Sequence, residues 1–115
     1  MINDVTSLAD LWLNHNSAAS MKIDPTINLP YEDPATCWMV VKEIVKRDLT
    51  PEQYANLAAG LLETLLSLHG ETYISEVEEL AKVDTRFNYL LGGVWQCLMP
   101  DDIWNRIVAI RNGTW

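Results

Sequence analysis

Acidic side chains are the residues of this sequence most able to do chemistry, because they gather in two short segments. The first segment lies between positions 71 and 84, and the second is the pair that follows Pro100. On a helix, Glu71 and Ser75 lie on one side because they are four residues apart, and Glu78 or Glu79 continues that ridge. Such a ridge can pair with the lysines and arginines of a partner, although an ordinary solvated helix face has the same composition. The carboxylates predicted to contact a partner are Glu71, Glu76, Glu78, Glu79, Asp84, Asp101 and Asp102.

Histidine and cysteine offer no recognisable catalytic or metal-binding pattern. Neither His15 nor His69 has a cysteine, serine or acid at a spacing that specifies a nucleophilic site. His69 fits better as the last residue of a helix, where the helix dipole favours a positive charge. Cys37 and Cys97 lie in apolar helical stretches and do not form the close-spaced pairs that metal sites need, so we expect two buried free thiols. The sequence therefore predicts a protein that is not an enzyme and binds no metal or cofactor.

Tryptophan is frequent, with five residues in a chain of 115. This residue is enriched at the centres of protein interfaces, but it also fills cores. Trp38 and Trp95 fall on predicted core stripes. Trp104 lies beside the apolar stripe of the last helix, and Trp115 stands at the end of the sequence. We therefore expect Trp104 and Trp115 to form an exposed patch or a homodimer contact, and Trp104 joins the predicted partner-binding residues.

Length and charge restrict the class of protein. A chain of 115 residues with 49% hydrophobic content has the size of one domain, which we take to span 1–115. The excess of 16 acidic over 8 basic residues gives a net charge of -8, which repels nucleic acid and anionic membrane surfaces and attracts a basic protein. No apolar run approaches the roughly 20 residues of a membrane-spanning helix, and the first residues lack a secretion signal. We expect a cytoplasmic protein.

The spacing of apolar residues predicts the elements that must position these side chains. Repeats at three and four residues favour an all-α fold, a compact bundle of about six helices that could be stacked helical hairpins. Residues 15–33 have no such repeat and contain two prolines, so we expect a loop packed on the body. The helices are predicted at about 7–14, 34–47, 51–69, 71–82, 85–98 and 101–112.

Caps and glycines mark where these helices begin and end. Thr6 or Ser7 is available to cap the first helix, and Thr50 with Gln53 forms a capping box for the third. Gly70 is predicted to end the third helix in a left-handed conformation. Two other glycine positions leave alternatives open. Gly60 either admits a close neighbour or breaks its helix, and the pair at 92–93 indicates a kink or close packing.

Several short motifs in the second half of the chain resemble a known family. They are NLAAG at 56–60, VEELA at 77–81, LLGGVWQ at 90–96 and MPDDIW at 99–104. These motifs resemble an uncharacterised bacterial family of small helical proteins, a domain of unknown function. The sequence departs from that family at Leu61 and Thr85, where the family often has proline. The resemblance implies a helical fold and a bacterial setting, but it supplies no activity.

Binding is the function that these observations favour. We expect an acidic inhibitor protein, above all an immunity protein that neutralises a bacterial toxin such as a nuclease toxin of contact-dependent or polymorphic type. An alternative is a phage or mobile-element inhibitor, similar to an anti-CRISPR protein, that imitates the charge of DNA toward a host defence complex. A structural homodimer is a further alternative, and it would show a self-complementary apolar patch around Trp104 or Trp115.

Overall fold

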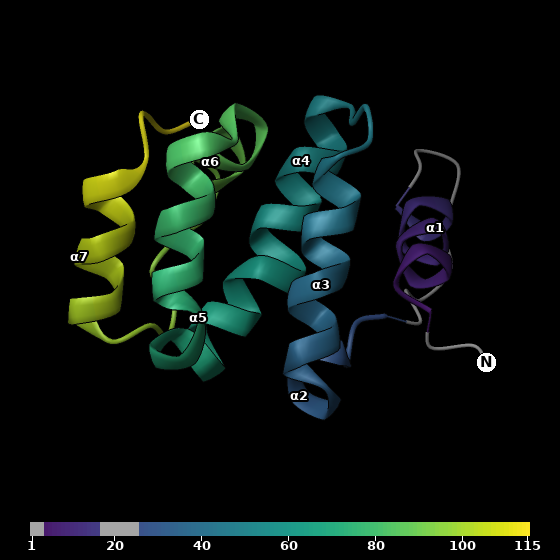
Figure 1. Cartoon of the computed structure of the whole chain (residues 1–115), viewed down its shortest axis with the longest axis horizontal. Coiled ribbons are helices and arrows are strands. Elements are labelled where there is room, and N and C mark those ends of the chain that lie inside the picture. Colours follow the sequence, from purple (N-terminus) through teal and green to yellow (C-terminus); the bar gives the residue numbers. More distant parts are fainter. Residues whose placement is uncertain (1–3, 17–25) are drawn as a thin grey trace.

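Helix α1 (Val5–His15) lies at one end of the molecule and helix α7 (Asp101–Ile110) at the other, with the remaining helices between them (Figure 1). This computed structural model describes residues 4–16 and 26–115, and no strand occurs within them. Helix α1 packs on α3, and α7 packs on α5. The predicted all-α bundle of about six helices is confirmed. The other elements are α2 (Leu29–Glu32), α3 (Pro34–Val45), α4 (Pro51–Leu57), the π-helical turn η1 (Ala58–Leu62), α5 (Glu63–Val83) and α6 (Thr85–Leu91).

Side chains that accept hydrogen bonds from free backbone N–H groups set the helix starts. The predicted capping box is confirmed, because Gln53 N donates to Thr50 Oγ1 at 3.1 Å and Thr50 N donates to Gln53 Oε1 at 2.9 Å. Asp33 and Asp84 cap α3 and α6 with a single hydrogen bond each, which the side chain accepts from a backbone N–H in the first turn. These caps allow short connections between α2 and α3 and between α5 and α6.

The N-terminal region differs from the sequence prediction in two respects. The cap of α1 is Asp4 rather than Thr6 or Ser7, since Ser7 N donates to Asp4 Oδ2 at 3.0 Å. Part of the predicted loop at 15–33 is helical, because Pro30 near the start of α2 sets a helical φ angle without losing a needed donor. Residues 17–25 of that loop lie outside the described residues.

Gly70 does not end a helix. It lies inside α5, no glycine of the described part has a positive φ, and the backbone departs from helical angles only at His69, with φ -135°. A Cβ atom on Gly70 would lie 2.9 Å from Cγ2 of Ile103, so the glycine lets α7 approach α5 closely. The left-handed C-cap predicted at Gly70 is therefore wrong. The helix boundary predicted at His69 is confirmed as a kink, because the non-helical φ and ψ of His69 (-135° and 28°) separate two helical segments within α5.

Gly60 belongs to η1, where the chain makes one π-helical turn between α4 and α5. No atom lies within 4 Å of the position that a Cβ atom would take there. A close neighbour at Gly60, the first of the two alternatives, is thus excluded. The second alternative takes the form of a local change from α-helical to π-helical hydrogen bonding.

Helix α6 stops at Leu91, and the predicted continuation to Leu98 is wrong. The reason is competition from the C-terminal residues, which occupy the space of the next helical turn. Trp115 N donates to Gly92 O at 3.1 Å, and the six-membered ring of Trp115 lies where a Cβ atom of Gly93 would be, at 2.5 Å. Close packing is therefore the reason for this glycine pair. Beyond the pair, Trp95 is exposed against prediction, at 71% accessible, whereas Val94 and Met99 are buried.

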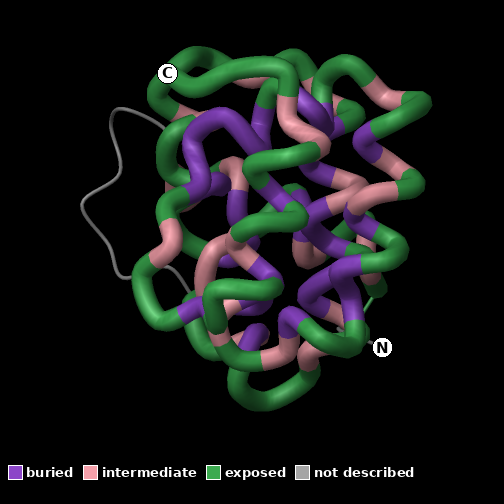
Figure 2. Tube along the Cα trace, turned by 90° about the vertical axis from the view of Figure 1, so that its left-hand side faces the viewer, coloured by how far each residue is buried: buried purple, intermediate pink, exposed green. Residues whose placement is uncertain are grey.

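Apolar side chains from most of the helices form one core, and Figure 2 shows the buried segments inside a shell of exposed residues. Trp38 is buried as predicted and meets the edge of Phe87 with 5.6 Å between ring centroids. Cys37 is buried, whereas Cys97 is exposed and has a φ of 48°, so the prediction of a buried thiol is wrong for Cys97. Burial of each large apolar side chain contributes about 2 kcal/mol to folding. The largest fully buried side chains include Trp12, Ile44, Leu57, Leu62, Leu65, Leu66, Ile74, Leu90, Leu91, Ile103 and Ile107.

Candidate partner-binding site

The predicted acidic residues are distributed over several faces of the molecule. Glu71, Glu76 and Glu79 are exposed on α5. Glu78 of the same helix is partly buried and pairs with Arg106 of α7. Asp84 is at the start of α6, and the carboxylates at 101 and 102 are at the start of α7. Of the ridge expected from helical spacing, Glu71, Ser75 and Glu79 are exposed to solvent, whereas Glu78 is paired with α7.

A shallow groove of about 450 Å³ lies between α3 and α5 and contains two of the predicted residues. Its base includes Trp38, whose indole N–H donates to Glu76 Oε1 at 3.2 Å. Its far end is open to solvent at Val83, which is 81% accessible. The groove therefore combines an apolar floor with a charged rim. The lining residues are Trp38, Lys42, Ser75, Glu76, Glu79, Leu80 and Val83.

The charges on this rim are held only loosely. The ammonium group of Lys42 lies 5.1 Å from the centroid of the Trp38 ring, a cation–π contact. Glu79 pairs with Lys82 at 3.6 Å, and both side chains are more than half exposed. Exposed ion pairs of this kind contribute little to stability, so a partner cation can replace Lys82 at small cost.

Three of the other predicted carboxylates have local roles inside the chain. Glu78 accepts hydrogen bonds from Nε and Nη2 of Arg106, and these bonds hold the pKa of Glu78 below its usual value. Asp84 accepts from a backbone N–H at the start of α6. Asp101 accepts from Gln96 Nε2 at 2.7 Å. These contacts tie α5 to α7 and fix the connection before α7, whereas Asp102 makes no ion pair within the described part.

Trp104 lies at a second site, away from the acidic side of α5. It is half-buried, and the guanidinium carbon of Arg111 lies 4.9 Å from its ring centroid. With Trp95 and Trp115 it lines a pocket of about 330 Å³. Sequence reasoning missed Trp95 and Arg111 as members of this site, because a continuous helix through Trp95 would have buried it. The glycine pair at 92–93 was the one available signal.

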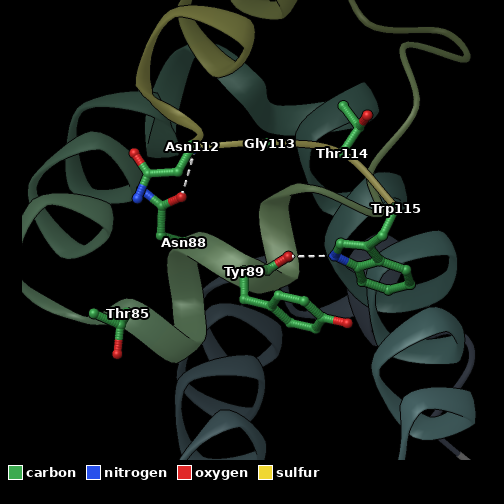
Figure 3. Close-up of a pocket in the computed structure, with 7 residues that line it drawn as sticks. All are labelled: Thr85, Asn88, Tyr89, Asn112, Gly113, Thr114 and Trp115. Atoms are coloured by element: carbon green, nitrogen blue, oxygen red, sulfur yellow. Dashed lines mark hydrogen bonds between the residues drawn. The ribbon is translucent and has the colours of Figure 1, made fainter.

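A third hollow, of about 410 Å³, lies beside the docked C-terminal residues (Figure 3). Asn112 N donates to Asn88 Oδ1 at 2.8 Å, and Trp115 Nε1 donates to the carbonyl oxygen of Tyr89 at 2.6 Å. The Trp115 ring stacks on Tyr89 with centroids 5.1 Å apart and planes 13° from parallel. These contacts fasten residues 112–115 to α6.

The described residues contain no group of three histidines, cysteines or carboxylates that could hold a metal ion. Burial raises the pKa of the Cys37 thiol to about 12, so this group is protonated and unreactive at neutral pH. None of the helices in the described ranges is long and apolar enough to cross a membrane.

These features define the class of protein: an all-helical domain that presents one groove with a charged rim and one pocket lined by indoles. Residues 13–115 match the model of a family of unknown function, DUF6869, and the chain belongs to that family. No curated protein and no solved structure matches the chain significantly.

Proposed function

We propose that this protein is an acidic inhibitor that binds the basic surface of another protein, as an immunity protein does with a bacterial toxin. On this proposal it is not an enzyme, acts in the bacterial cytoplasm, and uses the groove between α3 and α5 as the centre of its contact surface. The observation that carries the proposal is the way in which charge is distributed over the described residues.

Every lysine and arginine of residues 4–16 and 26–115 already has a partner within the chain. Five of them form ion pairs, and the other two lie over tryptophan rings. The ion pairs use only Asp10, Glu43, Asp48, Glu78 and Glu79. The other described carboxylates make no ion pair, so the net charge of -8 is displayed as unpaired negative groups. A field of this sign attracts a basic partner and accelerates association.

The groove offers a place where such a partner could be held after it arrives. A lysine or arginine side chain could lay its apolar stem along Leu80 and Val83 and keep its charged end near Glu76 or Glu79. Exposed apolar area at the base would add a contribution that salt does not screen. On this proposal the carboxylates without ion pairs attract the partner from a distance, and the groove residues hold it after contact.

This division of roles can be tested with two variants, each with one glutamate changed to lysine, that carry the same net charge. The test measures binding to the purified product of the neighbouring gene by surface plasmon resonance at two salt concentrations. Glu79→Lys changes the groove, whereas Glu52→Lys changes an exposed residue of α4 that does not line it. Both variants should lower the association rate by a similar factor. Only Glu79→Lys should raise the dissociation rate, by about tenfold or more.

The outcomes separate the general proposal from the choice of site. Equal dissociation rates for the two variants would remove the groove from the contact surface. An association rate that does not fall with added salt would contradict the role of negative charge. Undiminished affinity in both variants would overturn the acidic-inhibitor proposal for that partner.

A further inference from the structure

Three of the five tryptophans meet at one pocket, which the proposed function does not use. Trp95 comes from the connection between α6 and α7, Trp104 from α7, and Trp115 from the C-terminal residues. The pocket has a volume of about 330 Å³, within the range of sites that bind small organic molecules. Convergence of three indoles from three separate segments is not a consequence of helical spacing.

Two of the three tryptophans are fixed by contacts with residues outside the pocket. Trp95 N donates to Glu63 Oε1 at 2.9 Å, which fixes the backbone while the side chain stays 71% accessible. Trp115 is fixed by its stacking on Tyr89 and by the absence of a side chain at Gly93. The backbone of Trp95 is therefore anchored while its indole lies outside the core, where it is available to a ligand.

Arg111 gives this pocket its charge. Its Nη1 atom donates to Val94 O at 3.1 Å, and its guanidinium lies over the ring of Trp104. Unlike the other arginines of the described part, Arg111 has no carboxylate partner. No aspartate or glutamate lines the pocket either, although the chain has 16 of them. Both Nε and Nη2 thus remain available as donors to an anion.

We propose that this pocket binds a small aromatic carboxylate. The ligand ring would stack on the indole rings, and its carboxylate would accept hydrogen bonds from the free N–H groups of Arg111. An aromatic cation is disfavoured, because Arg111 already covers one face of Trp104 and would repel a second positive charge. A purely apolar ligand would leave the guanidinium without the anion that the other arginines have.

A series of probes that share one ring and differ in charge tests the proposal. The probes are naphthylacetate, neutral naphthylacetamide and cationic naphthylmethylamine, titrated into the full chain labelled with ¹⁵N. The indole N–H signals of Trp95, Trp104 and Trp115 should shift, and those of Trp12 and Trp38 should not. Naphthylacetate should bind at least about tenfold more tightly than the amide, as expected for one charge-assisted hydrogen bond.

Variants assign the binding to this pocket. Trp95→Ala should abolish binding, whereas Leu98→Ala, in the same connection and 79% accessible but outside the pocket, should not change it. Arg111→Gln keeps a donor for Val94 O and should remove the preference for the acid over the amide. Thermal unfolding of each variant checks that the fold persists.

Three results would overturn the proposal: equal or tighter binding of the amine, shifts at Trp12 and Trp38 instead of the pocket indoles, or no binding of naphthylacetate at millimolar concentration.

Discussion

The groove between α3 and α5 and the tryptophan pocket beside α7 are built in opposite ways. The groove is made by regular positions on two helices, where spacings of three and four residues recur, as from Trp38 to Lys42 and from Ser75 to Glu79 and Val83. In the tryptophan pocket only Trp104 lies within a helix. Gly92 and Arg111 directly follow α6 and α7, and the rest come from a connection and from the C-terminal residues. The groove carries charges of both signs, whereas the pocket carries one cation, Arg111, which has no carboxylate partner in the described part of the chain.

The two sites therefore depend on different parts of the fold. The groove needs only α3 and α5 to pack through Trp38, which the core ensures. The pocket exists only while Trp115 is docked on Gly93 and Tyr89. Changes that release the C-terminal residues should therefore remove the pocket and leave the groove intact.

The two cysteines should differ most strongly, in their reactivity toward a thiol reagent. Cys37 lies on α3 and is fully buried, and its pKa is raised from 9.0 to about 12. At a fixed pH below 9 this shift lowers the reactive thiolate fraction about 10³-fold, since each pKa unit is a factor of ten. Cys97 is exposed in the connection next to the pocket. Mass spectrometry after alkylation at pH 8 should find one modified site, Cys97.

A Cys97→Ser variant provides the control, since it should take up no reagent until denaturant unfolds the chain. Modification of Cys37 in the folded Cys97→Ser protein on the same timescale would show that the core beneath α3 opens readily. The groove would then be no more rigid than the pocket.

Gly93→Val should lower the free energy of unfolding by about 3 kcal/mol, the cost of severe overpacking. The added Cβ atom would lie 2.5 Å from the Trp115 ring, so the C-terminal residues must leave their place on α6. Chemical denaturation gives the free energy, and naphthylacetate titration should show that binding is lost. Gly60→Ala is the matched control, because its Cβ atom meets no atom within 4 Å. A similar loss of stability in both variants would mean that close packing of Trp115 is not the cause.

The successes and failures of sequence reasoning follow the same division. Thr50 and Gln53 were predictable because a capping box is formed by four consecutive residues. The shared side of Ser75 and Glu79 on α5 was predictable because their four-residue spacing determines it, and both line the groove. Gly70 and Trp95 were not predictable, since Ile103 and Trp115, which decide their surroundings, are more than 15 residues away. Long-range packing overrides local propensity at such positions.

Asn88→Ala should destabilise the chain by about 2 kcal/mol, since it leaves buried backbone groups without partners. Nδ2 of Asn88 donates to Ala81 O and Ile110 O, both at 3.1 Å, and its Oδ1 accepts from Asn112 N. The residue is 6% accessible, so water cannot replace these bonds fully. Asn105→Ala, an exposed change on α7, should leave stability unchanged. Equal denaturation midpoints for the two variants would contradict the anchoring role of Asn88.

The smallest effect should come from the ion pair that joins α5, which forms one side of the groove, to α7, which contributes Trp104 to the pocket. Glu78 of α5 accepts hydrogen bonds from Arg106 of α7, and these bonds lower the pKa of Glu78 in the folded chain. A carboxyl with a lowered folded pKa contributes stability above its unfolded value of about 4.5 and loses it as pH falls through the folded value. The pair is partly exposed to solvent, so we expect a small contribution that salt reduces further.

Measurement of this contribution requires comparison of pH profiles, since many carboxylates titrate together in acid. Glu78→Gln should flatten the fall in unfolding free energy below pH 4.5, and Arg106→Gln should flatten it to the same extent. Combining the two substitutions should add nothing further, because each removes the same interaction. An additive double variant would mean that the low pKa of Glu78 does not arise from Arg106. In that case α7 would be held on α5 by the close contact of Gly70 with Ile103 and not by charge.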